Sequence, residues 1–157
     1  MMMRAKFFVP LIAAFTIATS LLAQETPGGT QQLLVVMNTT VTKKEISVED
    51  LKNIYLGKTS FWPDNTSIKA FDRPVDRPAG QSFYRDVLKM VPARFRHHWQ
   101  GQQLAGRGIA PETLATVDDV VARVASTAGA VSYVHASEVP KTGLKNVITV
   151  SITEPKP

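Results

Sequence analysis

A run of five consecutive apolar residues constrains the fold of this chain more than any other feature. The run extends from Leu33 to Met37 (LLVVM) and is short enough for a strand. Because successive side chains of a strand point to opposite faces, a strand without polar residues needs cover on both sides. We therefore expect a β-sheet that carries other layers on both faces.

Helices are the natural candidates for those layers, and the clearest helical pattern follows Thr116. Valines recur there at the i, i+3, i+4 and i+7 spacing of one helix face: Val117, Val120, Val121 and Val124. Asp118 and Asp119 would place negative charge in the first turn, where the helix dipole favours it. Val121 lies inside the stripe, so we expect its side chain to be buried against the sheet.

Three more helices are predicted from caps and apolar spacing, at about residues 47–57, 80–90 and 92–103. Ser47 should cap the first, with Asp50 at its third position. Phe95 and Trp99 should face inward in the last. Proline at position 92 suits the first turn of a helix, where its missing N–H costs nothing.

Short strands are expected between these helices, at about residues 68–71, 130–134 and 147–152. Alternating strands and helices predict an α/β fold, which we expect to be a three-layer sandwich with a small, mostly parallel sheet. Ligands of such sheets bind outside the carboxyl ends of the strands. The loop from Arg73 to Gly80 follows the second of the four strands, so we expect the ligand site there.

That loop carries the chemistry that an anion would need. Arg73 and Arg77 supply positive charge, and the loop leads into the helix expected to begin near Gly80. The first N–H groups of a helix have no intrahelical partner and lie at the positive end of its dipole. The pattern suits an anion cradle. On local sequence alone a proline-stiffened connection with solvated arginines is favoured, and the position of the loop after a strand is what favours the cradle.

The first residues have the pattern of a secretory signal peptide. Arg4 and Lys6 precede an uncharged apolar stretch from Phe7 to Ala18, with cleavage expected after Ala23 or Ser20. The stretch is shorter than the ~20 apolar residues of a spanning helix. We expect a signal peptide at 1–23, a flexible leader at 24–32, a single domain at 33–152 and a tail at 153–157, in an exported, periplasmic protein.

Composition limits the classes of partner. Loss of Arg4 and Lys6 with the signal peptide would lower the formal net charge from +5 to +3. A mild charge without a basic stripe interleaved with aromatics does not favour nucleic acid. The chain has no cysteine, so after export no disulfide would support the fold and the hydrophobic core must suffice.

No metal site or catalytic site is predicted. His97 and His98 are adjacent on a helix and point about 100° apart, so they cannot share one metal ion, and His135 is distant in sequence. A triad of Ser82, His97 and Asp86 can be drawn, but no nucleophile elbow surrounds the serine. We expect no enzyme, no cofactor and no metal.

Three segments together resemble the periplasmic phosphate-binding proteins of ABC transporters. The segment DLKNIYLGK at residues 50–58, with Trp62-Pro63-Asp64 just after it, is similar to one signature of that family, and GAVSYV at 129–134 is similar to one of its strands. Residues 73–83 occupy the place of the family's phosphate-binding loop. The resemblance is mainly to the second of the family's two lobes, and implies the fold of one lobe of a type II periplasmic binding protein.

The resemblance also implies a set of ligand residues. Arg73, Asp76 and Gly80 match the family's loop, whereas Ala79 and Gln81 stand where the family has Ser and Thr. Asp76 would either hold an arginine in place or accept the proton of a protonated oxyanion. The candidate oxyanion-binding residues are Arg73, Asp76, Arg77, Gly80, Gln81 and Ser82.

Two functions remain open. The first is an exported, single-lobed solute-binding-like module that binds phosphate or a related oxyanion weakly at the loop from Arg73 to Ser82. The alternative is a protein-interaction domain on the same fold, with no ligand of its own, that docks to an envelope partner such as a transporter, sensor or porin. Neither involves nucleic acid or a membrane span after signal cleavage.

The N-terminal pattern predicts processing on export. Mass spectrometry of the envelope fraction should find a chain that lacks about its first 20–23 residues, because cleavage follows the small residues after the apolar stretch. A mature chain that still begins at Met1 would contradict this expectation.

Overall fold

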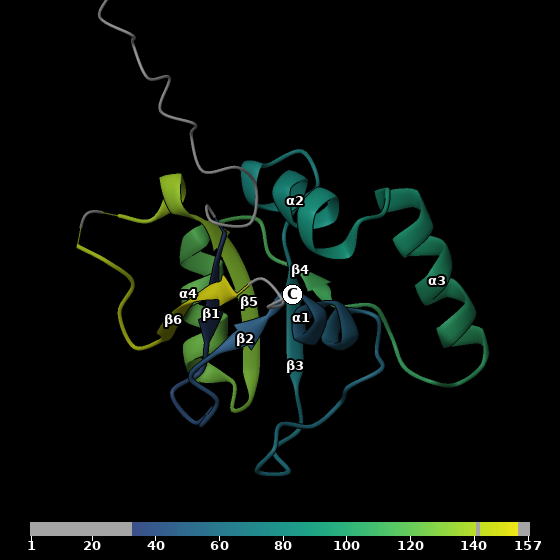
Figure 1. The fold of residues 1–157 in the computed structure, drawn as a ribbon, viewed down its shortest axis with the longest axis horizontal. Coiled ribbons are helices and arrows are strands. Elements are labelled where there is room, and N and C mark those ends of the chain that lie inside the picture. The colour runs from purple at the N-terminus through teal and green to yellow at the C-terminus, as the bar shows by residue number, and fades with distance from the viewer. Residues whose placement is uncertain (1–32, 141, 154–157) are drawn as a thin grey trace, which may run out of the picture.

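The computed structural model describes residues 33–140 and 142–153 of the chain. Within them a six-stranded sheet lies between helices (Figure 1). The signal peptide and leader predicted at residues 1–32, and the tail from residue 154 onward, lie outside the described residues.

The strand order of the sheet is β2-β6-β1-β5-β3-β4. The strands are β1 (Leu33–Met37), β2 (Ile46–Ser47), β3 (Lys69–Asp72), β4 (Glu112–Thr113), β5 (Ala130–His135) and β6 (Ile148–Thr153). β1 runs antiparallel to both of its neighbours, β5 and β6, and the other three pairings are parallel. Among the described strands, five therefore point the same way and only β1 is reversed, which confirms a mostly parallel sheet.

The two amphipathic helices with predicted caps begin where the sequence places them. The helices are α1 (Val48–Tyr55), α2 (Pro78–Ser82), α3 (Pro92–Leu104) and α4 (Val117–Ser126), with a π-helix, η2 (Phe83–Leu88), directly after α2 and a 3-10 helix, η3 (Ala136–Glu138), after β5. The Ser47 and Thr116 hydroxyls accept the backbone N–H of Asp50 and Asp119, each at 3.0 Å. Each aspartate in turn accepts the N–H of the cap residue. These reciprocal caps satisfy N–H groups that a helix start leaves free.

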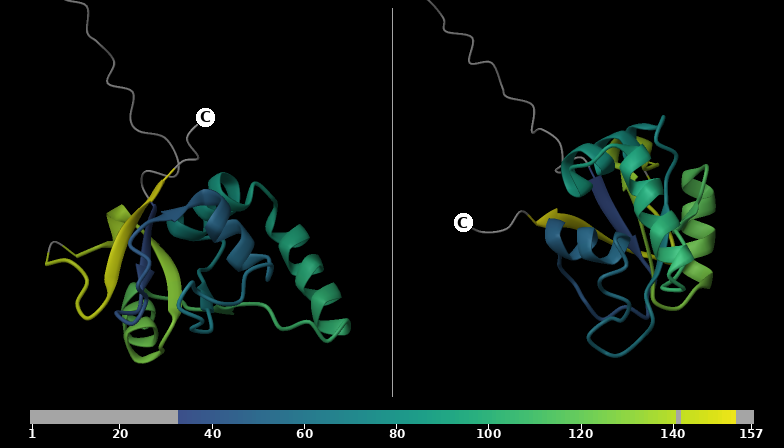
Figure 2. Two further views of the ribbon diagram at one scale, coloured as in Figure 1. Left: turned by 60° about the horizontal axis from the view of Figure 1, so that its bottom comes forward. Right: turned by 90° about the vertical axis from the view of Figure 1, so that its right-hand side faces the viewer.

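β1 is buried on both faces, as its apolar run predicts. Leu33, Val35 and Met37 belong to a core cluster that includes residues of α1, η2 and α3, and Val36 belongs to a second cluster that includes residues of α4. The sheet thus separates two cores, with α1 on one side and α4 on the other (Figure 2). The three-layer α/β sandwich is confirmed.

The helix that leaves the central loop begins earlier than predicted. α2 begins at Pro78 rather than near Gly80. Proline is favoured at the first helical position, because the N–H that it lacks would have no intrahelical partner there. From Phe83 the chain continues as the π-helix, and Lys89 ends it in the left-handed conformation, with φ 52°. The apolar spacing predicts a helix here but carries no signal for its wider winding.

In α4 the expectation for Val121 is wrong. Val120 and Val124 are fully buried, whereas Val117 and Val121 are only partly buried. Residues i and i+4 lie almost directly above one another on a helix, so the buried line runs through Val120 and Val124. Val121 is rotated about 100° from Val120 and lies at the edge of the contact.

Phe95 and Trp99 of α3 are buried as predicted, and the Trp99 indole N–H donates to the backbone oxygen of Tyr55 at 3.0 Å.

The sequence analysis missed three short elements: β2, β4 and η3. Each has two or three residues, which is too short for any periodicity to register. Within the described ranges, no helix is long and apolar enough to cross a membrane.

The burial pattern of α4 predicts where truncation destabilises the chain. Val120→Ala should lower the free energy of unfolding by about 1–3 kcal/mol, because it leaves a void in a fully buried position. Val121→Ala is the matched control on the same helix and should cost clearly less, since its side chain is partly exposed. Urea denaturation of both variants measures the difference, and equal losses would contradict the orientation of α4.

Candidate functional site

A pocket of about 490 Å³ lies outside the carboxyl ends of β3 and β4. This is the edge at which α/β sheets bind ligands. Its walls are formed by the loop after β3, by η2 and α3, and by Ala110, Pro111 and Thr113. The side chains at the pocket that could bind a polar ligand include Asp72, Asp76, Tyr84, Arg96, Gln100, Gln103 and Thr113.

The Asp72 carboxylate, at the end of β3, is the buried polar centre of this site. It accepts hydrogen bonds from the hydroxyls of Tyr84, at 2.7 Å, and of Tyr133, and from the Arg73 backbone N–H at 2.9 Å. Burial raises the pKa of Asp72, and these three hydrogen bonds partly oppose the rise. The carboxylate is therefore well satisfied by donors from three elements of the fold.

The tyrosines around Asp72 act as fixed donors. Burial, together with the neighbouring Asp72 charge, raises the pKa of Tyr84 and of Tyr133. Both hydroxyls therefore keep their protons at neutral pH. A third, Tyr55, donates to the backbone oxygen of Phe71 at 2.7 Å, so the end of β3 is held on this face of the sheet by side chains of α1, η2 and β5.

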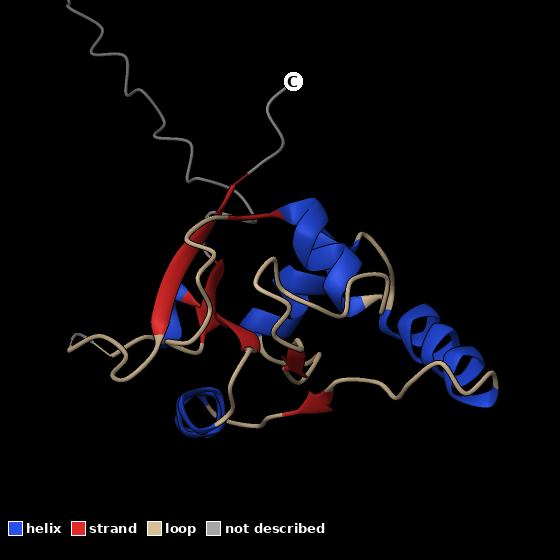
Figure 3. Cartoon of the chain, turned by 90° about the horizontal axis from the view of Figure 1, so that it is seen from below, coloured by secondary structure: helices blue, strands red, loops and turns tan. Residues whose placement is uncertain are grey.

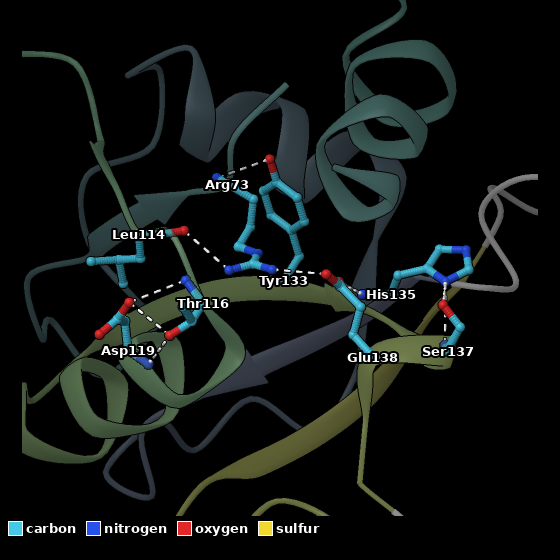
Figure 4. Close-up of polar contacts among 8 residues, drawn as sticks. All are labelled: Arg73, Leu114, Thr116, Asp119, Tyr133, His135, Ser137 and Glu138. Carbon is cyan, nitrogen blue, oxygen red and sulfur yellow. Dashed lines mark hydrogen bonds and ion pairs between the residues drawn. The ribbon is translucent and has the colours of Figure 1, made fainter. Parts of the chain in front are cut away.

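The Arg73 side chain extends toward Leu114 and Glu138 (Figure 4), whereas that of the adjacent Asp72 is bonded to Tyr84 and Tyr133 on the other face. Arg73 is only 2% exposed, and its guanidinium donates to the Leu114 backbone oxygen at 3.1 Å and to the Glu138 carboxylate at 2.9 Å. Its Nε is buried without a hydrogen-bond partner among the described residues. The second oxygen of Glu138 accepts the His135 backbone N–H at 3.1 Å. Arg73 therefore joins the end of β3 to η3 and to the turn between β4 and α4.

Figure 4 also shows the cap of α4 beside this ion pair. Hydrogen bonds from Thr116 lower the pKa of Asp119, and the nearby Arg73 charge contributes less. The buried cation and the helix start therefore favour an ionised Asp119.

The start of α2 is occupied by the loop that precedes it. A side chain at Gly80 would come within 2.1 Å of the Pro74 backbone oxygen, so this position tolerates only glycine. The Gln81 N–H donates to the Arg77 backbone oxygen at 2.9 Å. The backbone of the loop thus packs directly against the first turn of the helix, where the anion cradle was expected.

The six predicted oxyanion-binding residues are divided by the structure. Arg73 and Asp76 contribute to the wall of the pocket, whereas Arg77, Gly80, Gln81 and Ser82 do not. Gln81 lines a second hollow, of about 580 Å³, which shares Val75 and Tyr84 with the first. Ser82 is buried, and its hydroxyl accepts from Arg85 at 3.4 Å.

Sequence reasoning missed Asp72 and the polar residues of α3 at the pocket. Asp72 directly precedes Arg73, and an aspartate at the carboxyl end of a strand is itself a signal of a site. Arg96, Gln100 and Gln103 recur at i, i+4 and i+7, the spacing of one helix face. That stripe escapes a search for periodicity among apolar residues alone.

Two of the three histidines have polar contacts within the fold. His98 Nε2 lies 3.0 Å from the Leu56 backbone oxygen, and His135 Nδ1 lies 2.7 Å from the Ser137 hydroxyl (Figure 4). Across residues 33–140 and 142–153, no group of three or more His, Cys, Asp or Glu side chains is placed to hold a metal ion.

The fold of the chain matches that of solved proteins. It is similar to PstS from Borrelia burgdorferi, with a TM-score of 0.56 and 13% identity over 82% of this chain and 50% of that one. It is also similar to a protein from Clostridium perfringens described as a phosphate ABC transporter substrate-binding protein with bound phosphate, with a TM-score of 0.54 and 12% identity over 78% of this chain and 44% of that one. No protein-family model and no curated protein matches the sequence.

The chain has the fold of one lobe of a phosphate-binding receptor. It spans about half the length of the receptors that it matches. At these identities the likeness concerns the fold, and the chemistry of the site rests on the residues of this chain.

The raised pKa of Asp72 predicts a pH-dependent stability. The folded chain holds this proton to a higher pH than the unfolded chain, whose aspartate titrates near 3.8. The stability of the wild type relative to Asp72→Asn should therefore be greatest below the unfolded pKa of 3.8. This advantage should be lost as the pH rises through the raised pKa of the folded chain. Urea denaturation of both proteins across this range measures the change.

Tyr84→Phe provides the matched control for this titration. It removes a hydrogen bond that lowers the Asp72 pKa, so the loss of stability should extend to higher pH. A difference between wild type and Asp72→Asn that does not vary with pH would show that Asp72 titrates alike in the folded and unfolded chains.

Proposed function

We propose that this chain is an exported, single-lobed solute-binding module that weakly binds hydrogen phosphate or a related protonated oxyanion. The observation that carries the proposal is the pocket at the carboxyl end of β3, where the Arg96 cation and the Asp76 carboxylate line one cavity. The fold supports it, because the matching protein from Clostridium perfringens is described as a phosphate ABC transporter substrate-binding protein with bound phosphate.

Arg96 is the best-placed charge partner for the oxyanion. Its side chain is exposed on α3 and contributes to the pocket wall, whereas the Arg73 guanidinium is already bonded to Glu138 and Leu114. Amide groups of Gln100 and Gln103 on the same helix face can add neutral hydrogen bonds. An arginine offers an oxyanion two donors in a fixed fork.

The expected affinity is low because the pocket is open to solvent on one side and few charged donors face it. A hydrogen bond to a charged group contributes about 1.5–3 kcal/mol. Two such bonds would correspond to a dissociation constant on the order of 1 mM, which is about −4 kcal/mol. This is the weak binding expected of a single lobe.

Asp76 would select for a protonated oxyanion. Its carboxylate is exposed at the pocket and can accept the P–OH hydrogen of hydrogen phosphate. Sulfate has no proton near neutral pH and would meet this carboxylate without a hydrogen bond between them. The site would therefore prefer hydrogen phosphate to sulfate.

Isothermal titration of the purified chain with phosphate tests the charge partner. Arg96→Ala should weaken binding by about 1.5–3 kcal/mol, because it removes a charge-assisted hydrogen bond. Arg94→Ala is the matched control, since Arg94 is exposed on the same helix and is not among the residues that line the pocket. No heat of binding in the wild type even at high phosphate concentration would overturn the proposal in favour of a protein-interaction domain.

The same titration with sulfate tests the carboxylate. Wild type should bind phosphate more tightly than sulfate, and Asp76→Asn should bring the two affinities together because an amide can donate to either ion. If phosphate and sulfate bind the wild type equally, Asp76 has no part in selection.

A further inference from the structure

The carboxyl end of α3 and the turn after it form a projecting tip with two exposed aliphatic side chains. Leu104 is 91% exposed and Ile109 is 75% exposed. In Figures 1 and 3 this end of α3 lies at the edge of the ribbon, away from the sheet. Large aliphatic residues at such exposure cost hydration free energy that nothing within the described chain recovers.

The turn between the two side chains is built to project. Gly106 and Gly108 take positive φ angles, 67° and 131°, which glycine adopts without strain. A side chain added at Gly106 would meet no atom within 4 Å. The turn is therefore open at Gly106, whereas at Gly108 it lies near the Trp99 ring, which an added Cβ would meet at 3.7 Å.

The segment that carries the tip has positive charge and no acidic residue. From residue 89 to residue 111 the sequence contains no Asp or Glu, and the cations in this stretch are Lys89, Arg94, Arg96 and Arg107. Arg107 lies between the two aliphatic residues in sequence. All four are exposed; Arg107 lies in the tip, and the other three lie in the first turns of α3 or just before it. An anionic surface that meets the tip would be attracted directly by Arg107 and, at longer range, by the charge along the helix.

We propose that the α3 tip, residues 104–109, docks the protein on an anionic membrane surface. Leu104 and Ile109 would enter the boundary between head groups and acyl chains, and Arg107 would meet anionic head groups. The inference does not depend on the oxyanion pocket.

The shape of the tip favours lipid over a protein partner. A stable protein interface takes about 800 Å² from each side, on surfaces that fit one another. Two side chains on a narrow convex turn offer little of that area. A bilayer needs no preformed complement, because its lipids rearrange around an inserted side chain.

A site-specific probe tests the docking, since the chain has no cysteine of its own. Ala105→Cys places a polarity-sensitive fluorophore between the two aliphatic residues, and Ala122→Cys places it at an exposed position of α4. Vesicles of phosphatidylcholine with or without phosphatidylglycerol are added at about 0.1 M salt, where charges still act over ~10 Å. The probe at position 105 should shift to the blue with anionic vesicles only, and the probe at 122 should not respond.

A double variant tests the apolar contribution. It carries Leu104→Ser and Ile109→Ser in the Ala105→Cys background. The lipid concentration needed for the shift should rise at least about tenfold, because apolar area has been removed from the tip. Both side chains are largely exposed, so the thermal midpoint should not change, which separates lost docking from lost folding.

The proposal fails under any of three outcomes. The first is no shift at position 105, and the second is an equal shift at position 122. The third is a shift that survives the double serine substitution, because the attraction would then be of charge alone. A shift with poly-glutamate but not with vesicles would instead assign the tip to an acidic protein.

Discussion

The end of β3 is the junction on which the rest of this structure depends. Asp72 and Arg73 are consecutive residues whose side chains leave the strand on opposite faces. Asp72 is held by hydroxyls from η2 and β5 on one face, and Arg73 is held by Glu138 and the Leu114 oxygen on the other. Two adjacent residues therefore connect both outer layers to the sheet, and removal of one partner of a buried ion pair typically costs about 3–5 kcal/mol.

This arrangement decides which charges are available to a ligand. A buried guanidinium must be paired, because its desolvation is costly, and the charge of Arg73 is neutralised by Glu138. Asp72 likewise directs its oxygens to two tyrosines and to a backbone N–H. Under the proposed function, recognition of a solute would be left to exposed groups around the junction, which is why Arg96 and Asp76 carry that function. Buried groups fix the shape of the pocket, and exposed groups would supply its selectivity.

The α3 helix lies between the two proposed activities. On the side that faces the pocket it presents Arg96, Gln100 and Gln103, and at its end it presents Leu104. Phe95 and Trp99 are its buried side chains. A helix attached to the core through two aromatic side chains leaves most of its surface exposed, and that surface can serve ligands or membranes without disturbing the fold.

The sequence by itself determined the layers of this protein. The apolar run of β1 requires cover on both faces, and the caps at Ser47 and Thr116 set the starts of α1 and α4, because these signals act between residues close in the chain. It also indicated the loop after β3 as the expected place for a ligand.

Tertiary structure alone decided that Arg73 turns inward, since its partners Leu114 and Glu138 lie 41 and 65 residues further along the chain. The same holds for the pocket, where Asp72, Tyr84 and Arg96 meet only because β3, η2 and α3 pack at one edge of the sheet. Local patterns specify elements through neighbouring residues, whereas the direction of a charged side chain depends on which distant group can offset its burial.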